Sequence, residues 1–298
     1  MSITIRIKGG IGNQLFMYAA ARRLAFINNQ ELLIDNISGF VNDKKYNRKY
    51  QLDYFNIPCR KLNSIECKEQ SSRVRRSFKK ITNFFLPFET KRYIKQEDIY
   101  FDSRILNLKF KHNLYLEGYF QSEAYFKDFD FQIKKDLEIY PPKNDSNIKM
   151  ATKIKKNFPA VALHFRFFNK IPNNEIEKKF SINVPENYYR NAIQKIDKLF
   201  PNAHYFIFSD NLKLARTQVR LNDKRVTLVG HNDNDSNAYA DLWLMTQCQH
   251  FIIANSTFSW WGAWLAKFKD KVVIAPSTNE KYGHWADPKL LPKEWIQL

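Results

Sequence analysis

The chain has 298 residues, of which 44% are hydrophobic, and its 48 Lys and Arg exceed its 30 Asp and Glu to give a formal net charge of +18. This apolar content excludes a largely disordered chain, and the length allows one large α/β domain or two smaller ones. No apolar run reaches the roughly 18 residues that span a bilayer, and the first residues lack the pattern of a signal peptide. We therefore expect a cytoplasmic protein, and the basic surplus favours an anionic partner: a phosphate-bearing substrate, a nucleic acid or a membrane surface.

The first 35 residues predict a strand, a glycine turn, a helix and a second strand. Residues 3–9 alternate β-branched and basic side chains, residues 14–29 have helical composition and spacing, and residues 31–35 form a short apolar run. A β-α-β opening of this kind is typical of nucleotide-binding folds.

The turn between this strand and helix, GGIGN, is the first candidate site. Gly10 and Gly12 would let backbone amides approach a diphosphate at the helix N-terminus. Asp35 lies about twenty residues further on, where a dinucleotide-binding fold keeps its ribose-binding acid. Leu15 stands where the third glycine is expected, so an ordinary tight βα turn explains these residues slightly better. A dinucleotide-dependent oxidoreductase is the alternative function that they leave open.

The stretch from residue 71 to residue 95 is strongly basic, with eight Lys and Arg against one Glu. A basic amphipathic helix can lie on an anionic membrane, although most amphipathic helices bury their apolar stripe in a protein core. We favour the second reading for the stripe and keep a peripheral contact at the inner membrane face as a hypothesis for the basic side chains. The stripe is formed by Val74, Phe78, Ile81 and Phe85.

A proline and polar break at residues 140–145 separates two halves of the chain, which we divide as residues 1–150 and residues 151–298. Strands and helices alternate in the second half, which predicts parallel sheets. The predicted strands are residues 159–168, 204–211, 224–230, 250–255 and 271–277, and the predicted helices are residues 184–200, 237–248 and 256–268.

Polar side chains stand at the ends of these predicted strands, where parallel α/β sheets bind their ligands. Arg166 ends one strand, and its planar fork suits a phosphate, although a structural salt bridge is an equally simple reading. The stretch ANSTFSWWGAWLA, residues 254–266, places hydroxyls and amides at the start of a helix, which favours an anion. Capping of that helix by Ser256 or Thr257 would use the same groups, so both readings stay open. The full strand-end set is His164, Arg166, Ser209, Asp210, Asn255, Ser256 and Thr257.

Together, these segments resemble the α-1,2-fucosyltransferases of glycosyltransferase family 11. The matching segments appear in the order of the family and extend from Gly9 to about Pro276. The last of them is long and specific. They read GGIGNQLFMYAAARRLA, LEGYFQSEAYF, VALHFRFF, YFIFSD and DLWLMTQCQHFIIANSTFSWWGAWLA.

The resemblance implies a GT-B-like α/β fold, in which two Rossmann-like domains with parallel sheets face a central cleft. It implies a galactoside 2-α-L-fucosyltransferase that moves L-fucose from GDP-fucose, with inversion, to the 2-hydroxyl of a terminal galactose. Residues 1–150 would form the acceptor side and residues 151–298 the GDP-fucose-binding domain. The expected setting is the synthesis of a glycan or of a bacterial surface polysaccharide, with a peripheral contact to an anionic membrane. The aromatic residues follow core periodicity, so no nucleic-acid partner is expected.

The resemblance also assigns roles to single residues around the sugar donor. Asn13 and Arg166 would approach the β-phosphate and act catalytically by stabilising the charge that develops on the leaving group. Asp241 would hold the guanine. The set that binds the sugar donor is completed by Gly10, Gly12, His164, Ser256, Thr257 and Phe258.

No cofactor and no metal are expected. The three cysteines form no metal-like cluster. Two DxD spellings, Asp128–Asp130 and Asp233–Asp235, have the letters of a metal motif, but a motif this short often arises by chance. The resemblance implies a metal-independent reaction.

The chain departs from the HxRRxD pattern that is usual in the family, because the motif here is HFRFFN. Phe167 replaces the second Arg, and Asn169 stands where an Asp is common. An amide does not take a proton at neutral pH, so either the Asp of the family is not the general base or this enzyme is impaired, and we favour the first reading. Glu117, Glu175 and Glu177 are the candidate acids that remain.

Overall fold

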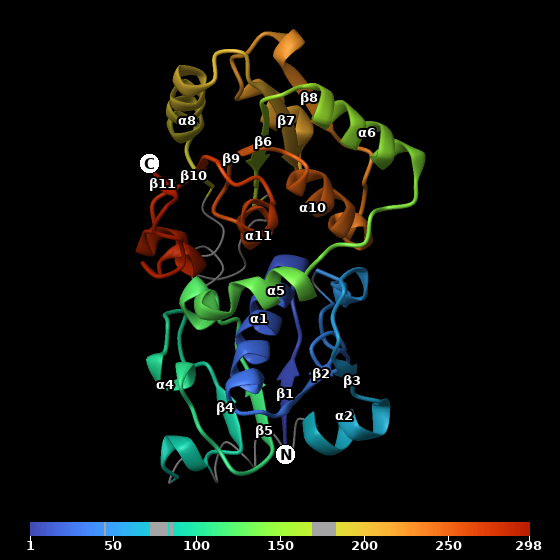
Figure 1. Ribbon diagram of the computed structural model, residues 1–298, viewed down its shortest axis with the longest axis vertical. Coiled ribbons are helices and arrows are strands. Elements are labelled where there is room, and N and C mark those ends of the chain that lie inside the picture. Colours follow the sequence, from blue (N-terminus) through green and yellow to red (C-terminus); the bar gives the residue numbers. More distant parts are fainter. Residues whose placement is uncertain (45, 72–82, 84–85, 169–182) are drawn as a thin grey trace. The chain divides into compact units, whose positions relative to one another are not determined.

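Two compact α/β units, Met1–Glu138 and Ile139–Leu298, make up the computed structural model of the chain (Figure 1). The structure describes residues 1–44, 46–71, 83, 86–168 and 183–298. Each unit is built around a parallel sheet with helices connecting its strands. The predicted α/β class with two Rossmann-like units is therefore confirmed.

The sheet of the first unit has the strand order β3-β2-β1-β5-β4. The central strand β1 pairs in parallel with β2 and with β5, so that Ile3 lies opposite Leu32 on one side and Leu114 on the other. Ile3 and Ile5 are fully buried, as expected for a central strand of a parallel sheet. The strands are β1 (Ser2–Arg6), β2 (Glu31–Asp35), β3 (Arg60–Lys61), β4 (Tyr93–Lys95) and β5 (Leu114–Glu117).

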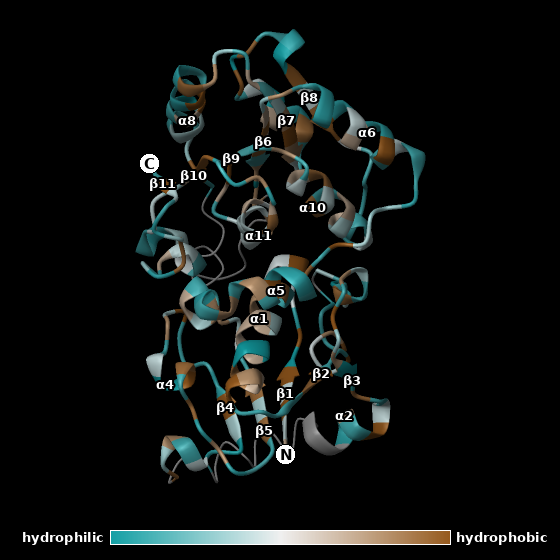
Figure 2. Cartoon of the chain, in the orientation of Figure 1, coloured by the Kyte–Doolittle hydropathy of each residue, from teal (hydrophilic) through white to brown (hydrophobic). Residues whose placement is uncertain are grey.

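The helix α1 (Ile11–Ile27) is buried along most of its length. Most residues of such a helix are apolar, and in Figure 2 the ribbon of α1 is largely white and brown, whereas longer teal stretches mark α6 and α8. Two of its polar side chains share one acceptor. The Tyr18 hydroxyl donates a hydrogen bond to Asp136 Oδ2 at 2.7 Å, and Arg22 donates to the same oxygen at 2.8 Å. The other helices of this unit are short: α2 (Ser64–Ser71), α4 (Ser103–Leu106), α5 (Asp130–Asp136), η1 (Leu52–Tyr54), η2 (Phe88–Thr90), η3 (Glu123–Tyr125) and η4 (Lys127–Phe129).

The sheet of the second unit has the strand order β11-β10-β9-β6-β7-β8, and its strand pairs are parallel. Its strands are β6 (Ala160–Phe165), β7 (His204–Ser209), β8 (Val226–Val229), β9 (His250–Ile252), β10 (Val273–Ala275) and β11 (Ile296–Gln297). Its helices are α6 (Asp145–Lys156), α8 (Glu186–Leu199), α9 (Leu212–Thr217), α10 (Ala238–Thr246), α11 (Thr257–Leu265), η5 (Asp223–Arg225), η6 (Asp235–Asn237) and η7 (Glu280–Trp285).

The division between the units lies at residues 138 and 139, whereas the sequence led us to divide the chain after residue 150. Residue 150 lies inside α6, which packs against α10 of the second unit. All of α6 therefore belongs to the second unit. The proline and polar break at residues 140–145 is the better marker of the boundary.

The tryptophans of α11 fasten this helix inside the second unit. Trp260 and Trp261 are fully buried, and the Trp260 indole donates a hydrogen bond to the Leu290 carbonyl at 3.0 Å. A Cβ at Gly262 would come within 3.0 Å of Met245 on α10, so this glycine lets α10 and α11 approach closely. The two helices are thereby locked to each other through the WWG sequence.

Several sequence predictions fall outside the described residues. The stripe Val74, Phe78, Ile81 and Phe85 is among them, as are Asn169, Glu175 and Glu177. The end of the basic stretch is described, and it forms the strand β4. Among the helices that the structure describes, none has the length and apolar character needed to cross a membrane.

Candidate functional site

The N-terminus of α1 is formed by the predicted glycine turn. Gly9 has a φ of +73°, a conformation that favours glycine, and Gly10 precedes the helix with extended backbone angles and without a side-chain cap. Asn13 lies in the first turn, and its side-chain oxygen accepts a hydrogen bond from Gln121 at 2.8 Å. A Cβ at Gly9 would be 3.2 Å from the Asn13 amide nitrogen, so the turn and this side chain lie in close contact. The structure thus brings Gly10, Gly12 and Asn13 together at one helix end.

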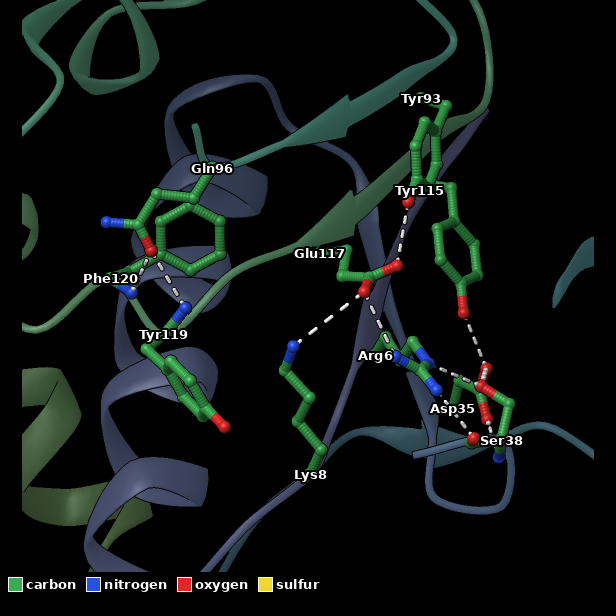
Figure 3. Close-up of polar contacts among 10 residues, drawn as sticks. All are labelled: Arg6, Lys8, Asp35, Ser38, Tyr93, Gln96, Tyr115, Glu117, Tyr119 and Phe120. Carbon is green, nitrogen blue, oxygen red and sulfur yellow. Dashed lines mark hydrogen bonds and ion pairs between the residues drawn. The ribbon is translucent and has the colours of Figure 1, made fainter. Parts of the chain in front are cut away.

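Asp35 is a structural acid in this fold. It is fully buried and accepts hydrogen bonds from the Tyr115 hydroxyl at 2.6 Å and from the Ser38 hydroxyl at 2.5 Å, with the Ile37 and Ser38 amides also donating (Figure 3). Burial alone would raise the pKa of Asp35, but these donors bring it below its usual value. A carboxylate so occupied is not placed to bind a ribose, which argues against its role in the oxidoreductase alternative.

Glu117, one of the candidate acids, is held between two cations in the same region (Figure 3). One carboxylate oxygen is 3.0 Å from an Arg6 nitrogen and 3.7 Å from the Lys8 ammonium, and the other accepts the Tyr93 hydroxyl at 2.7 Å. Burial lowers the pKa of Lys8, and the Glu117 charge opposes that shift. Both oxygens of Glu117 are engaged, so its contacts are those of a structural ion pair and not of a base open to a substrate hydroxyl.

A second polar set lies at the ends of β6 and β7 in the second unit. Arg166 forms an ion pair of 2.8 Å with Asp210, whose other oxygen accepts the Phe167 amide at 2.9 Å. Arg166 therefore does form the structural salt bridge that the sequence left open as a possibility. The Asp210 contact involves one terminal nitrogen, and the Arg166 side chain stays 32% exposed, so its fork can still reach an anion.

Phe167, at the position of the missing second Arg, belongs to the hydrophobic core of this unit. Its side chain is 5% exposed and stacks on Phe165, with ring centroids 6.0 Å apart and planes 9° apart. At this position, where the family usually has a second Arg, the chain therefore has a side chain that packs in the core and carries no charge.

His164 is the buried member of the strand-end set. It is 5% exposed, its ring lies 5.4 Å from that of Phe258, and among the described residues its Nδ1 has no hydrogen-bond partner. Burial, helped by the charge of Arg166, lowers the pKa of His164 to about 3. The imidazole is therefore neutral near pH 7 and carries no positive charge.

The N-terminus of α11 follows β9, the neighbour of β6 in the sheet. Ser256 occupies the N-cap position with extended backbone angles, but its side chain makes no capping hydrogen bond. The structure thus decides against the alternative in which Ser256 caps this helix. The Phe258 ring places this turn beside His164, and the dipole at a helix N-terminus favours an anion.

Asp241 lies in the first turn of α10, which follows β8. Its Oδ1 accepts a hydrogen bond from the Asn232 side chain at 2.8 Å. Burial raises the pKa of Asp241 to about 7, with the Asn232 hydrogen bond lowering it and Asp233 raising it. The sequence signalled Asp241 only through the resemblance, and it gave no sign of Asn232.

The first DxD spelling is occupied by cations. Asp128 forms an ion pair of 2.7 Å with Arg23, and Asp130 forms one of 2.7 Å with Lys134. Within the described part of the chain, no three or more His, Cys, Asp or Glu side chains are grouped as a metal site would need. The absence of a metal from the reaction stays a prediction.

The pKa of His164 predicts a specific pH dependence of stability. The native imidazole stays neutral down to about pH 3, whereas the unfolded one takes up a proton below about pH 6.5, so stability is lost as the pH falls through that range. Between pH 8 and pH 5 we expect the wild type to lose about 2 kcal/mol more free energy of unfolding than His164→Gln, which cannot titrate. All 6 tryptophans lie in the second unit, so denaturant unfolding followed by their fluorescence reports on this unit. Parallel pH profiles of the two proteins would contradict the assignment.

Comparison with known proteins identifies relatives along the whole chain. The family model described as Glycosyl transferase family 11 matches residues 2–298. The O-antigen biosynthesis glycosyltransferase WbnK of Escherichia coli is 30% identical over 310 residues, which cover 98% of this chain and 99% of that protein. An alpha-1,2-colitosyltransferase of Escherichia coli is 28% identical over 310 residues, which cover 100% of this chain and 99% of that protein. The resemblance is confirmed, and the oxidoreductase alternative is wrong.

Solved structures show the same fold at lower identity. The fucosyltransferase NodZ from Bradyrhizobium matches with a TM-score of 0.52 and 16% identity, over 88% of this chain and 91% of that chain. A structure of NodZ alpha-1,6-fucosyltransferase soaked with GDP-fucose matches with a TM-score of 0.50 and 15% identity, over 89% and 92% of the two chains. These likenesses concern the fold alone, and they confirm the expected GT-B-like class.

Proposed function

Because the chain belongs to glycosyltransferase family 11, we propose that it moves L-fucose from GDP-fucose to the 2-hydroxyl of a terminal galactose, with inversion, in an α-1,2 linkage. The two relatives named above, an O-antigen glycosyltransferase and an alpha-1,2-colitosyltransferase, favour a bacterial surface polysaccharide as the product. A peripheral contact of the basic stretch with an anionic membrane belongs to the same proposal.

The observation that carries the proposal is the set of anion-binding groups at one edge of the second unit. The N-terminus of α11, where the Ser256 side chain makes no capping bond, lies beside a buried His164 whose Nδ1 has no partner among the described residues, and Arg166 directly follows the strand β6 that carries His164. A diphosphate needs hydrogen-bond donors of this kind, fixed in place before it binds. Asp241, in the first turn of the neighbouring helix α10, supplies a carboxylate for the nucleobase.

The chemistry that we propose is a single displacement. The acceptor 2-hydroxyl oxygen forms a bond to the anomeric carbon and gives its proton to a general base, while the bond from that carbon to the β-phosphate oxygen breaks. The electron pair leaves with GDP, so negative charge grows on the β-phosphate. Arg166 and the first turn of α11 stabilise that charge.

The assay that tests this function uses GDP-fucose and a soluble β-galactoside, followed by determination of the linkage in the product by NMR. We expect fucose on the 2-hydroxyl with the α configuration. Because a colitosyltransferase is among the relatives, GDP-linked colitose is assayed in parallel. Transfer of colitose without transfer of fucose would refute the proposed sugar, and transfer to another hydroxyl would refute the proposed linkage.

Replacement of Arg166 tests the charge stabilisation. We expect Arg166→Ala to lower kcat by at least about a hundredfold, the scale of losing one fixed donor to a transition-state charge. Arg166→Lys should also be poor, since an ammonium group cannot form the bidentate fork. Arg190→Ala is the matched control, because Arg190 lies on α8 and pairs with Glu186 at 3.7 Å. Near-normal turnover of Arg166→Ala would contradict the role.

Chelation tests the absence of a metal. The proposed cationic and amide groups do the work that a divalent ion would otherwise do, so we expect initial rates in EDTA to equal those without it. A loss of activity that manganese or magnesium restores would show that one of the DxD spellings binds a metal.

A further inference from the structure

Asp241 is held by a chain of side-chain amides that the proposed function does not use. Among the described residues, Asn232 donates to Asp241 Oδ1 at 2.8 Å, and no donor reaches Asp241 Oδ2. Asn232 also exchanges two hydrogen bonds of 2.9 Å with Asn147, amide to amide. Asn144, the N-cap of α6, accepts the Asn147 side chain at 2.8 Å and the Asn147 backbone amide at 2.9 Å. We call Asn144, Asn147, Asn232 and Asp241 the amide relay.

The relay allows one orientation of the Asn232 side chain. Both hydrogens on its Nδ2 are used, one by Asp241 and one by Asn147, and its oxygen accepts from Asn147. Asn147 is fully buried, and the His231 ring nitrogen lies 3.0 Å from its Oδ1. Turning the Asn232 amide over would leave buried polar atoms unpaired, which is costly. The Asp241 carboxylate is therefore anchored through the first turn of α6.

The anchored carboxylate faces the proposed ligand edge. The helices α10 and α11 follow β8 and β9, so both begin at the carboxyl ends of parallel strands, and they pack against each other. Asp241 lies in the first turn of α10, and the proposed phosphate-binding turn is the first turn of α11. An elongated ligand with a phosphate at α11 would therefore extend toward α10.

The chemistry of Asp241 selects among nucleobases. A carboxylate whose Oδ1 is fixed and whose Oδ2 is open accepts two adjacent N–H groups, as the N1–H and 2-amino groups of guanine provide. Adenine instead presents the lone pair of its N1 beside its amino group, and that lone pair repels a carboxylate. The hydrogen bond from Asn232 also favours the ionised acid that this recognition needs, since it opposes the rise that burial causes in the pKa of Asp241.

We infer that Asn232 is a positioning residue that, locked to Asn147, orients Asp241 for guanine and so gives the protein its preference for guanine over adenine nucleotides. The inference rests on the proposed function, whose sugar donor is a guanine nucleotide, and goes beyond it by assigning base selectivity to a residue that does not touch the ligand.

The test is the substitution Asn232→Asp, which keeps the shape of the side chain but replaces the donor to Asp241 with a second carboxylate. Dissociation constants for GDP, ADP and inorganic diphosphate are measured by calorimetry. We expect the GDP constant to rise by about tenfold or more, the scale of a lost hydrogen bond to a charged group. The constants for ADP and diphosphate should stay unchanged, so that the preference for GDP over ADP collapses. In turnover, KM for GDP-fucose should rise while kcat stays.

Asn237→Asp is the matched control. It makes the same charge change in the same segment, but the Asn237 side chain donates to the backbone carbonyl of Asp233 at 2.8 Å and not to Asp241. We expect it to change GDP binding by less than about twofold, since an exposed charge contributes little. Tryptophan fluorescence checks that each variant folds. If Asn232→Asp does not fold, the same three dissociation constants are measured for Asn232→Ala, with the same expected loss of GDP binding.

The binding constants distinguish a failure of the positioning role of Asn232 from a failure of the proposed sugar donor. Equal weakening of GDP, ADP and diphosphate, or no change in any of them, would overturn the positioning role of Asn232. A wild-type protein that binds ADP as tightly as GDP would instead overturn the proposed sugar donor, and the inference with it. A selective loss of GDP binding in Asn232→Asp, absent from Asn237→Asp, supports both.

Discussion

The anchoring of α11 in the core of the second unit is the constraint on which the proposed ligand site depends. Free backbone amides bind an anion well only if they are held rigidly, because ordering them at the moment of binding would cost free energy. Burial of Trp260 and Trp261 and the close approach at Gly262 hold the helix before any ligand arrives. The first turn of α11 is then held in a fixed position, as the proposed anion site requires.

Two side chains of the proposed site are also held in position by supporting partners before any ligand binds. Asp210 holds Arg166 with one oxygen and the backbone of the next residue with the other, so the guanidinium is oriented while part of it stays exposed. Asn232 holds Asp241 in a comparable way. In both cases a buried or half-buried partner fixes the group that would meet the ligand. Supporting contacts of this kind let a site keep charged groups ready without large motions on binding.

The carboxylates of the first unit show the opposite use of charge. Asp35 and Glu117 stand at the ends of β2 and β5, where a parallel sheet places ligand-binding residues. Each is buried and saturated with internal donors, so each stabilises the turns around it and has little left to offer a substrate. Position at a strand end is thus not enough to assign a function, since the partners of the side chain decide what it can do.

The α/β class, the alternation of strands and helices, the family and the set of residues at the strand ends could all be predicted from the sequence. These follow from local periodicity, from glycine turns and from motifs, all of which are written along the chain. Only the tertiary structure decided that Ser256 leaves its helix uncapped, that Phe167 is a core residue and that the unit boundary precedes α6. It also decided that Asn147 supports Asn232 across 85 positions of sequence. The physical reason is that hydrogen-bond partners and burial depend on residues distant along the chain, which no local pattern records.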